Sequence, residues 1–517
     1  MAFTSAAFGL FVAAGLILYY LLPKKARPYC LLLLSYGFYL TYGFSFLPYL
    51  LFTTLSTYGF ARLIDKEPKS NAALDEKERK RKLAKRKKAL CAACLVLNFG
   101  LLYFVKYWNF TLDQLGVPAA VLRTDLAMPL GISFYIFQSM GYLIDVKRGK
   151  FPAEKNIFRF ALFVSFFPQL VQGPIGRYDA LSPTLLCGND LSFDNIKDGT
   201  KTVFRGLLKK LCLADRAAVC AAAVLDVGNG VYGGVVTLCG ILFYCVQLYC
   251  DFSGGIDIAR GVGKLFGTEM AENFRRPIFS QSLAEFWRRW HITLGTWLKD
   301  YLFYPLTLSK PFIKFGKFTR RHIKGNAGKI LSTSLATFIV YFVIGIWHGA
   351  NFKYVLFGVY NGIIITASLL AGPHFAARRA REKALSPIRK KCLSALRMLR
   401  TSVLVVIGRY ITRAADIPDA FAKLGSLFCD GRIGELSGSL FLSFGLSAVD
   451  YAVLAVGVLL LFAAEYADEK GTPLTEAIEK KGTVAVFLTA VLLFAAFLAF
   501  GVYRGSYISS EFIYKQF

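Results

Sequence analysis

The chain has 517 residues, of which 55% are hydrophobic, and its mean hydropathy is +0.47. Its net charge is +29, but the basic residues lie in stretches between apolar runs, so we expect no nucleic-acid partner. Uncharged runs of about 20 residues match the thickness of a bilayer and exclude a set of ordinary soluble domains. The composition therefore predicts a helical protein that is surrounded by membrane lipid.

The first apolar run, residues 2–22, has no basic start and no small-residue cleavage site. It is followed by "PKKARP", so we interpret it as a retained span rather than a signal peptide. We predict an all-α polytopic fold in one domain over residues 1–517, with about 11 to 13 membrane helices. The further expected spans are 29–42, 44–64, 89–108, 126–144, 157–174, 202–225, 231–250, 331–348, 354–371, 401–412, 440–464 and 483–503.

Three basic stretches between the apolar runs predict the topology. Residues 66–88, 310–329 and 378–400 hold eleven, seven and nine Lys or Arg, respectively, and the last two stretches together contain a single acid. By the positive-inside rule, these stretches are cytoplasmic. They could also attract anionic partners, and the sequence leaves open whether they only fix topology. The expected cytoplasmic basic loops are about 65–88, 309–329 and 376–400.

The segment "FFPQLVQGPIGRY", residues 166–178, interrupts an apolar run. Pro168, Gly173, Pro174 and Gly176 cannot continue one regular helix. Irregular backbone at membrane depth is tolerated only where protein buries it or where it lines a water-filled cavity. Two interpretations stay open, a helix end that enters a loop and a re-entrant segment that shapes a cavity.

The stretch "EFWRRWHITLGTWLKDYLFYPL", residues 285–306, holds three of the five Trp and one of the four His in the chain. At 100° per residue, Trp287, Trp290 and Trp297 fall within about 60° of one direction, and the charged residues fall on the other side. The pattern predicts one amphipathic helix. Its aromatic face suits either a bilayer surface or a buried site, and His291 lies on the rim of that face.

The segment "FIVYFVIGIWHGANFKYVLFGVYNG", residues 338–362, places another His in an apolar run. No Lys, Arg, Asp or Glu occurs in residues 330–352, so His348 is the readily ionisable group of that run near neutral pH. Ionisable groups in a bilayer are costly and are ordinarily functional or paired. Basic stretches on both sides predict that residues 330–371 cross the membrane and return. His348 would then lie about 27 Å from the inner end of the first leg, in the outer half of the membrane.

A neutral imidazole can take a proton from an alcohol that attacks an acyl carbonyl, which accelerates acyl transfer by about 10²- to 10⁴-fold. His348 and His291 are the candidate catalytic residues, and a structural hydrogen-bonding role is the alternative. His322 and His374 adjoin basic loops, where we expect them to be solvated. The sequence has no P-loop, HExxH or GxSxG motif. Two isolated His without nearby carboxylates do not indicate zinc, so we expect no metal site.

The segment "NFRRPIFSQSLAEFWRRWHITLGTWLKDYLFYPL", followed by "IGIWHGANFKYVLFGVYNG", resembles the core of the membrane-bound O-acyltransferase (MBOAT) family. The segments "PLGISFYIFQSMGYLIDVKRG", "FFPQLVQGPIGRY", "YCDFSGGIDIARGVGKLFG" and the terminal "FIYKQF" resemble its bacterial branch. That branch includes the alginate O-acetylation membrane subunit and the teichoic acid D-alanylation membrane protein. The resemblance runs from about Pro129 to Gly362, and its motifs are closer to the alginate-acetylation type.

The resemblance implies that His348 matches the family's near-invariant catalytic His and that His291 matches its second characteristic position. It also implies a many-helix membrane fold with re-entrant or broken segments around a central tunnel. The candidates for the tunnel wall are Trp287, Trp290, Trp347 and Asn351.

The implied activity is the transfer of an acyl group, expected to be acetyl, toward a cell-envelope polysaccharide outside the cytoplasm. The donor would be acetyl-CoA or an acyl carrier protein thioester on the cytoplasmic side, and no cofactor would stay bound. A partner acyltransferase outside the cytoplasm is expected to complete the modification. The implied location is the bacterial cytoplasmic membrane, which the chain crosses many times.

Two alternatives stay open. The first is D-alanyl transfer to teichoic acid from a carrier protein. The second is a lipid or solute transporter, which should show intramembrane carboxylates or an inverted repeat, and Asp251 and Asp257 are the suggestive acids. Arg409, in "VLVVIGRYITRAADIPDAF", departs from the charge-free version of similar proteins and has no assigned role.

Overall fold

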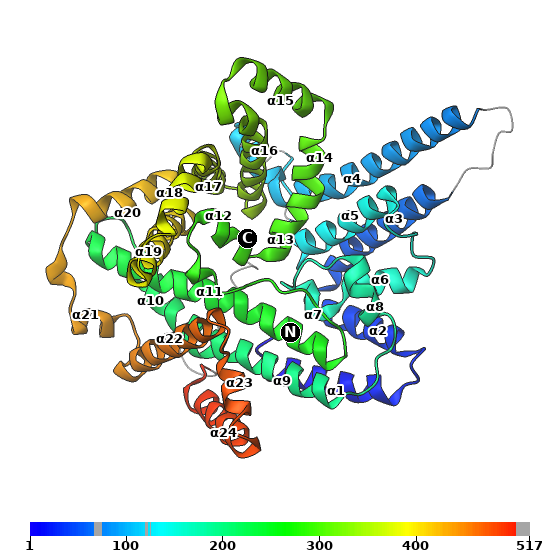
Figure 1. The fold of residues 1–517 in the computed structure, drawn as a ribbon. Coiled ribbons are helices and arrows are strands. Elements are labelled where there is room, and N and C mark those ends of the chain that lie inside the picture. Colours follow the sequence, from blue (N-terminus) through cyan, green and yellow to red (C-terminus); the bar gives the residue numbers. More distant parts are fainter. Residues whose placement is uncertain (67–74, 119–121, 125, 503–517) are drawn as a thin grey trace. The chain divides into compact units, whose positions relative to one another are not determined.

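The computed structural model describes residues 1–66, 75–118, 122–124 and 126–502 (Figure 1). The terminal "FIYKQF" segment lies outside the described residues. The chain forms two compact units, residues 1–205 with 255–272, and residues 206–254 with 273–517. That the two units form a single membrane domain stays a prediction.

The all-α polytopic class is confirmed, because the described residues form helices and no strand beyond one isolated bridge. Among the described residues, six helices are long and apolar enough to cross a membrane. The count becomes seven if the pair at residues 27–40 and 44–65, which is bent by 115°, forms one further span. Several of the expected apolar runs are divided into shorter helices, which this count of long helices leaves out.

In the first unit, the helices pack around α3, which contacts α4, α5 and α6. Helix α9 crosses from this unit into the second, and the last part of α11 also belongs to the first. The elements are α1 Ala6–Leu21, α2 Arg27–Leu40, η1 Phe44–Phe46, α3 Leu47–Asp65, α4 Glu76–Gln114, α5 Ile132–Arg148, α6 Ile157–Ser165, α7 Phe167–Leu170, α8 Tyr178–Leu185 and α9 Phe193–Leu207.

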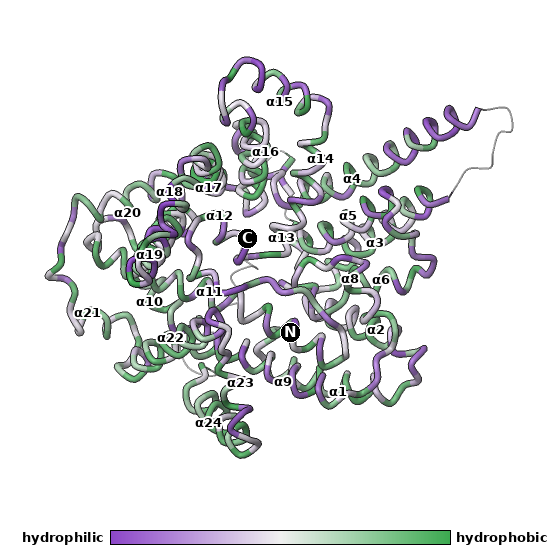
Figure 2. Tube along the Cα trace, viewed as in Figure 1, coloured by the Kyte–Doolittle hydropathy of each residue, from purple (hydrophilic) through white to green (hydrophobic). Residues whose placement is uncertain are grey.

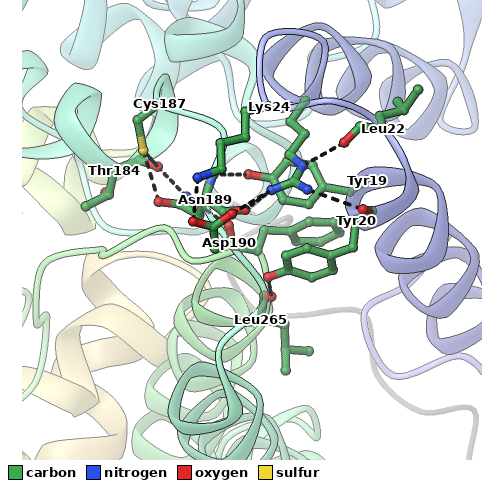
Figure 3. A network of polar contacts seen from close by, with 11 residues as sticks. Tyr19, Tyr20, Leu22, Lys24, Thr184, Cys187, Asn189, Asp190 and Leu265 are labelled. Atoms are coloured by element: carbon green, nitrogen blue, oxygen red, sulfur yellow. Dashed lines mark hydrogen bonds and ion pairs between the residues drawn. The ribbon is translucent and has the colours of Figure 1, made fainter.

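A polar network in the first unit ties α1 to the segment before α9 and to the end of α11 (Figure 3). Asn189 is its centre: its backbone N–H donates to the Tyr19 hydroxyl at 2.9 Å, and its side-chain amide donates to the Thr184 carbonyl at 2.6 Å. The Tyr20 hydroxyl donates to the Leu265 carbonyl at 2.6 Å. These bonds satisfy backbone groups at helix ends, which otherwise lack partners.

The broken segment at residues 166–178 also lies in the first unit. Helix α6 ends at Ser165, the one-turn helix α7 follows, and the chain then runs without regular structure to Tyr178. Residues 166–175 are all buried. The Gln169 side-chain amide donates to the carbonyl of Pro174 at 2.6 Å, so protein groups satisfy the irregular backbone. The helix therefore ends in a buried segment rather than in a solvated loop.

The second unit contains the remaining elements and the first part of α11. They are the π-helical η2 Leu208–Ala214, α10 Asp215–Leu225, α11 Gly234–Leu265, η3 Pro277–Phe279, α12 Leu283–Arg289, α13 Ile292–Leu298, the π-helical η4 Lys299–Phe303, α14 Tyr304–Thr307, α15 Lys310–His322, α16 Gly325–His348, α17 Phe352–Leu370, α18 Gly372–Glu382, α19 Pro387–Arg413, α20 Ile417–Cys429, η5 Ile433–Glu435, α21 Gly438–Ser443, α22 Ala448–Glu469, α23 Leu474–Glu479 and α24 Thr483–Phe500.

Helices α16 and α17 form the expected hairpin, with a short turn between His348 and Phe352 (Figure 1). The two helices approach closely at Gly345 and Gly358. A Cβ atom on Gly345 would lie 2.4 Å from the backbone oxygen of Tyr354, and one on Gly358 would lie 2.6 Å from that of Tyr341. Only glycine permits this approach, which fixes the position of the turn and of His348 before it.

The expected basic loops are largely helical. Residues 76–88 form the start of α4, a helix of 39 residues that is hydrophilic in its first part and hydrophobic later (Figure 2). Residues 310–322 form α15, and residues 372–382 and 387–400 lie in α18 and α19. Closely spaced Lys and Arg do not prevent a solvated helix, because their side chains project into water. Their cytoplasmic placement stays a prediction.

Candidate active site

The prediction of one amphipathic helix over residues 285–306 is wrong, because the chain breaks between α12 and α13. His291 adopts a left-handed backbone conformation with φ of +49°. The adjacent Trp290 pairs with Phe274 in an isolated antiparallel bridge. The N–H of Ile292 donates to the carbonyl of Asn273 at 3.0 Å. Hydrogen bonds to a distant segment thus replace helical ones at the break, where His291 lies.

Asn273 holds the side chain of His291. Its Oδ1 atom lies 3.3 Å from Nδ1 of His291 and also accepts hydrogen bonds from the Thr293 N–H at 3.0 Å and hydroxyl at 2.8 Å. An amide oxygen is an acceptor, so Nδ1 carries the proton in this contact and Nε2 keeps its lone pair. The sequence analysis did not select Asn273, although it begins the segment "NFRRP". Only the fold brings it to His291.

His291 is enclosed by the protein. Its side chain is 2% exposed, and its ring lies 5.0 Å from that of Phe252 in α11. Burial lowers the pKa of His291 to about 3, because an imidazolium would lose its hydration there. His291 lies outside the membrane-spanning helices and is neutral at physiological pH. Since Trp290 and Trp297 are buried too, the aromatic face packs inside the protein rather than on a bilayer surface.

His348 is the last residue of α16, and Trp347 joins it to His291. The Trp347 ring lies 5.9 Å from the His291 ring and 5.1 Å from the His348 ring, measured between centroids. Phe357 and Tyr354 of α17 contact His348 on another side, at 5.8 and 6.2 Å. The structure therefore brings both predicted histidines and Trp347 into one aromatic cluster. The Nε2 atoms of both histidines are buried in it.

The other predicted tunnel residues have distinct positions. The indole N–H of Trp287 donates to Oδ1 of Asn361 at 2.9 Å, and the Trp287 ring lies 6.0 Å from that of Phe357. Trp290 stacks on Phe286 at 5.5 Å. Asn361 is a buried residue of α17 that the sequence analysis also missed.

Asn351 lies at the turn of the hairpin, but its side chain caps α17. Its Oδ1 atom accepts a hydrogen bond from the N–H of Lys353 at 2.9 Å, and its Nδ2 atom donates to the Ala415 carbonyl at 3.3 Å. These bonds give Asn351 a structural role at the helix start. The place of Asn351 in a tunnel wall stays a prediction.

The remaining histidines and the suggestive acids lie elsewhere. His322 and His374 are exposed, and their contact with water stays a prediction. Asp251 pairs with Lys210 at 2.6 Å, and Asp257 pairs with Arg205 at 2.8 Å. Because both acids are engaged in ion pairs, they offer little support for the transporter alternative.

The cluster suits proton transfer. A neutral imidazole can accept a proton from a hydroxyl at Nε2, and aromatic rings surround both imidazoles. The second imidazole can hydrogen-bond to substrate or stabilise charge on a carbonyl oxygen.

Comparisons with known proteins agree with this chemistry. Residues 152–398 match the profile of MBOAT, the membrane-bound O-acyltransferase family. The chain is 31% identical to the probable alginate O-acetylase AlgI of Pseudomonas putida over 98% of each chain. It is 33% identical to the protein of that name in Pseudomonas aeruginosa, over 86% of this chain and 79% of that one. It is 26% identical to the teichoic acid D-alanyltransferase of Bacillus subtilis, over 46% of this chain and 58% of that one. The chain therefore belongs to the membrane-bound O-acyltransferase family and is a multi-pass membrane acyltransferase.

Proposed function

We propose that His348 is the general base of an O-acetyl transfer and that His291 assists it. The acceptor hydroxyl oxygen attacks the thioester carbonyl and forms a C–O bond, while its proton passes to Nε2 of His348. The C–S bond then breaks, and the thiolate receives that proton and leaves as a thiol. The observation that carries this proposal is the meeting of His291, Trp347 and His348 in one aromatic cluster.

The direction of transfer follows from the expected topology. If the basic segments face the cytoplasm, α16 begins there at Gly325 and ends on the outer side at His348. An acetyl group from cytoplasmic acetyl-CoA, or from a carrier protein thioester, would reach an acceptor beyond the bacterial cytoplasmic membrane. The acceptor side is a cell-envelope polysaccharide, reached through an extracytoplasmic partner enzyme. Relatives named as alginate O-acetylases, over most of both chains, support this assignment.

Analysis of the envelope esters tests the proposal in cells. A deletion strain should lose ester-linked acetate, and wild-type protein should restore it. The His348→Ala variant should reach the membrane in normal amount and restore none. His322→Ala is the matched control, because this exposed histidine should not affect the reaction. Normal acetylation in the strain that carries His348→Ala would exclude the assigned base.

D-alanyl transfer is the second candidate, because one relative is a teichoic acid D-alanyltransferase. The two functions share the chemistry of a thioester and a hydroxyl, so the cluster alone does not separate them. Analysis of the esters that mild base releases from the envelope of the deletion strain separates the two functions. Loss of D-alanine with retained acetate would favour the second candidate over the first.

A further inference from the structure

A cleft of about 910 Å³ lies in the first unit, where the segment between α5 and α6 meets α2 and α3. We call it the α5–α6 cleft. Its wall includes Tyr29, Tyr58, Glu154, Lys155, Phe158 and Arg159. The histidine cluster belongs to the second unit, so the proposed acetyl transfer does not account for this cleft.

Hydrogen bonds hold the wall of the cleft in place. The Tyr58 hydroxyl, in α3, donates to the Lys155 carbonyl at 2.7 Å. The side-chain amide of Asn156 donates to the hydroxyl oxygen of Tyr29, in α2, at 3.0 Å. Because the Tyr29 oxygen is the acceptor in that bond, its O–H group can donate to a ligand. The segment is thus fixed against both helices before any ligand binds.

The α5–α6 cleft has two cations, Lys155 and Arg159, against one acid, Glu154. The acid is already engaged. Its Oε1 atom accepts from the N–H groups of Lys155 and Asn156 at 2.8 and 2.9 Å, and its Oε2 atom accepts from the Tyr178 hydroxyl at 2.6 Å. Arg159 is exposed, and its Nε atom lies 4.0 Å from Oε2 of Glu154, too far for a hydrogen bond. Its planar N–H donors suit a phosphate, and the positive net charge attracts one.

An exposed apolar strip leads from the cleft along α2. Tyr29, Leu33 and Leu40 are exposed and recur at helical spacing on one face, which also carries Gly37. Phe158, at the start of α6, is 57% exposed, and its ring lies 6.3 Å from that of Tyr29. In a multi-pass membrane protein, such a strip contacts hydrocarbon, and a Tyr at its end is typical of the membrane interface. The ligand that fits is therefore amphiphilic.

The predicted topology places the cleft at the inner membrane interface. Helix α3 ends at Asp65, and the basic stretch begins at Lys66, so Tyr58 is about 12 Å from that stretch along the helix axis. With the basic stretch in the cytoplasm, the cleft lies at the level of the inner headgroups. Anionic lipids give that surface a negative potential, which basic side chains complement.

We propose that the α5–α6 cleft binds the headgroup of an anionic phospholipid, of the phosphatidylglycerol kind, in the inner leaflet. Arg159 and Lys155 pair with its phosphate, and the Tyr29 hydroxyl donates to the same group. The acyl chains lie along the exposed strip of α2. The bound lipid joins α2 to the segment between α5 and α6 and stabilises the first unit. This binding is independent of the proposed acetyl transfer.

Lipid titration of the full-length protein tests the site. Native mass spectrometry of protein purified in a neutral detergent gives dissociation constants for dioleoyl phosphatidylglycerol, dioleoyl phosphatidylcholine and soluble glycerol phosphate. We expect the first lipid to bind about 10-fold more tightly than the other two probes, and Arg159→Gln to weaken that binding about 10-fold. Arg159→Lys should recover part of the affinity. Arg81→Gln is the matched control, since it removes an exposed cation of α4 outside the cleft.

Melting temperatures complete the test. Phosphatidylglycerol should raise the melting temperature of wild type and of Arg81→Gln more than that of Arg159→Gln. Without lipid, Arg159→Gln should melt as wild type does, because its side chain is exposed.

Three results would overturn the lipid site. The first is equal affinity of wild type for the two lipids, or equal loss of affinity in Arg159→Gln and Arg81→Gln. The second is glycerol phosphate that binds as tightly as phosphatidylglycerol, which would assign the cleft to a soluble phosphate ligand. The third is a lower melting temperature of Arg159→Gln without lipid, with unchanged lipid affinity, which would assign Arg159 to structural support of Glu154.

Discussion

At the residue scale, the orientation of His291 depends on one oxygen atom. Oδ1 of Asn273 accepts from Thr293 twice and contacts Nδ1 of the imidazole. This arrangement sets which ring nitrogen carries the proton. The role that we propose for His291 therefore depends on a residue that need not touch the substrate.

Asn273→Ala should impair both folding and turnover. It leaves buried donors of Thr293 and His291 without their acceptor, which should reduce the free energy of unfolding by about 1–3 kcal/mol. We expect kcat to fall about 10-fold with a smaller change in KM, because the ring of His291 is no longer held. Asn273→Asp keeps an acceptor and should retain more activity than Asn273→Ala. Wild-type kcat in the alanine variant, measured by acetyl transfer, would show that this orientation does not matter.

The burial of His291 predicts how stability depends on pH. Its pKa is lowered from 6.5 to about 3, so between these values the unfolded chain binds a proton that the folded chain does not. The contribution of His291 to the free energy of unfolding is complete above the pKa of the unfolded chain and is lost as the pH falls from about 6.5 toward 3. The melting temperature should therefore fall on acidification. His291→Asn should weaken this dependence, and equal slopes for the two proteins would argue against a buried neutral ring.

At the element scale, the α16–α17 hairpin positions His348. The close approach at Gly345 leaves no room for a side chain, because Tyr354 backbone oxygen lies 2.4 Å from the position of a Cβ atom. The apolar run, its lone histidine and the flanking basic stretches were enough to predict this hairpin from sequence. Its turn, α16 and α17 lie where the pattern placed them.

Gly345→Ala should separate the two helices. We expect a loss of about 1–3 kcal/mol in the free energy of unfolding, with reduced acetyl transfer, because the backbone of α17 must shift. Gly425→Ala in α20 is the control, since no atom lies within 4 Å of its Cβ position. That variant should be neutral or more stable by up to about 1 kcal/mol. Equal melting temperatures for the two variants would contradict the packing.

The α12–α13 break shows where sequence periodicity fails. The 3.6-residue pattern placed Trp290 and Trp297 on one aromatic face and left open whether lipid or protein covers it, and the structure buries both residues. It could not reveal the break, because the hydrogen bonds that replace the helical ones are made with Asn273 and Arg275. These residues belong to an earlier segment of the chain, outside α12 and α13. For the same reason Asn273 and Asn361 were not predicted, whereas both histidines were.

At the scale of the whole molecule, composition and the motifs predicted the all-α membrane class and the family. The total number of membrane helices stays a prediction, because a run such as residues 202–225 divides into α9, η2 and α10, which a count of long apolar helices leaves out. A hydropathy pattern records apolar length, but it does not record whether protein or lipid surrounds a helix. Arg409 was recognised as a departure, but only the fold places it on Trp290.

Two native cysteines allow the topology to be measured. Cys392, near the basic start of α19, and Cys429, at the end of α20, are both exposed. In variants in which the other ten cysteines are replaced, a membrane-impermeant maleimide should label Cys429 in sealed spheroplasts. Cys392 should react only after permeabilisation, because the positive-inside rule places it in the cytoplasm. Labelling of Cys392 in sealed spheroplasts would show that the predicted orientation, and with it the proposed direction of transfer, is wrong.

The most direct test of His348 as the base is acetyl transfer by purified protein. Wild type, His348→Ala and His322→Ala are supplied with labelled acetyl-CoA and, in parallel, with acetyl carrier protein, together with the envelope polysaccharide and its partner enzyme. The account predicts transfer by wild type and His322→Ala, and a rate about 10²- to 10⁴-fold lower for His348→Ala at an unchanged melting temperature. A His348→Ala rate within a few-fold of wild type would contradict it.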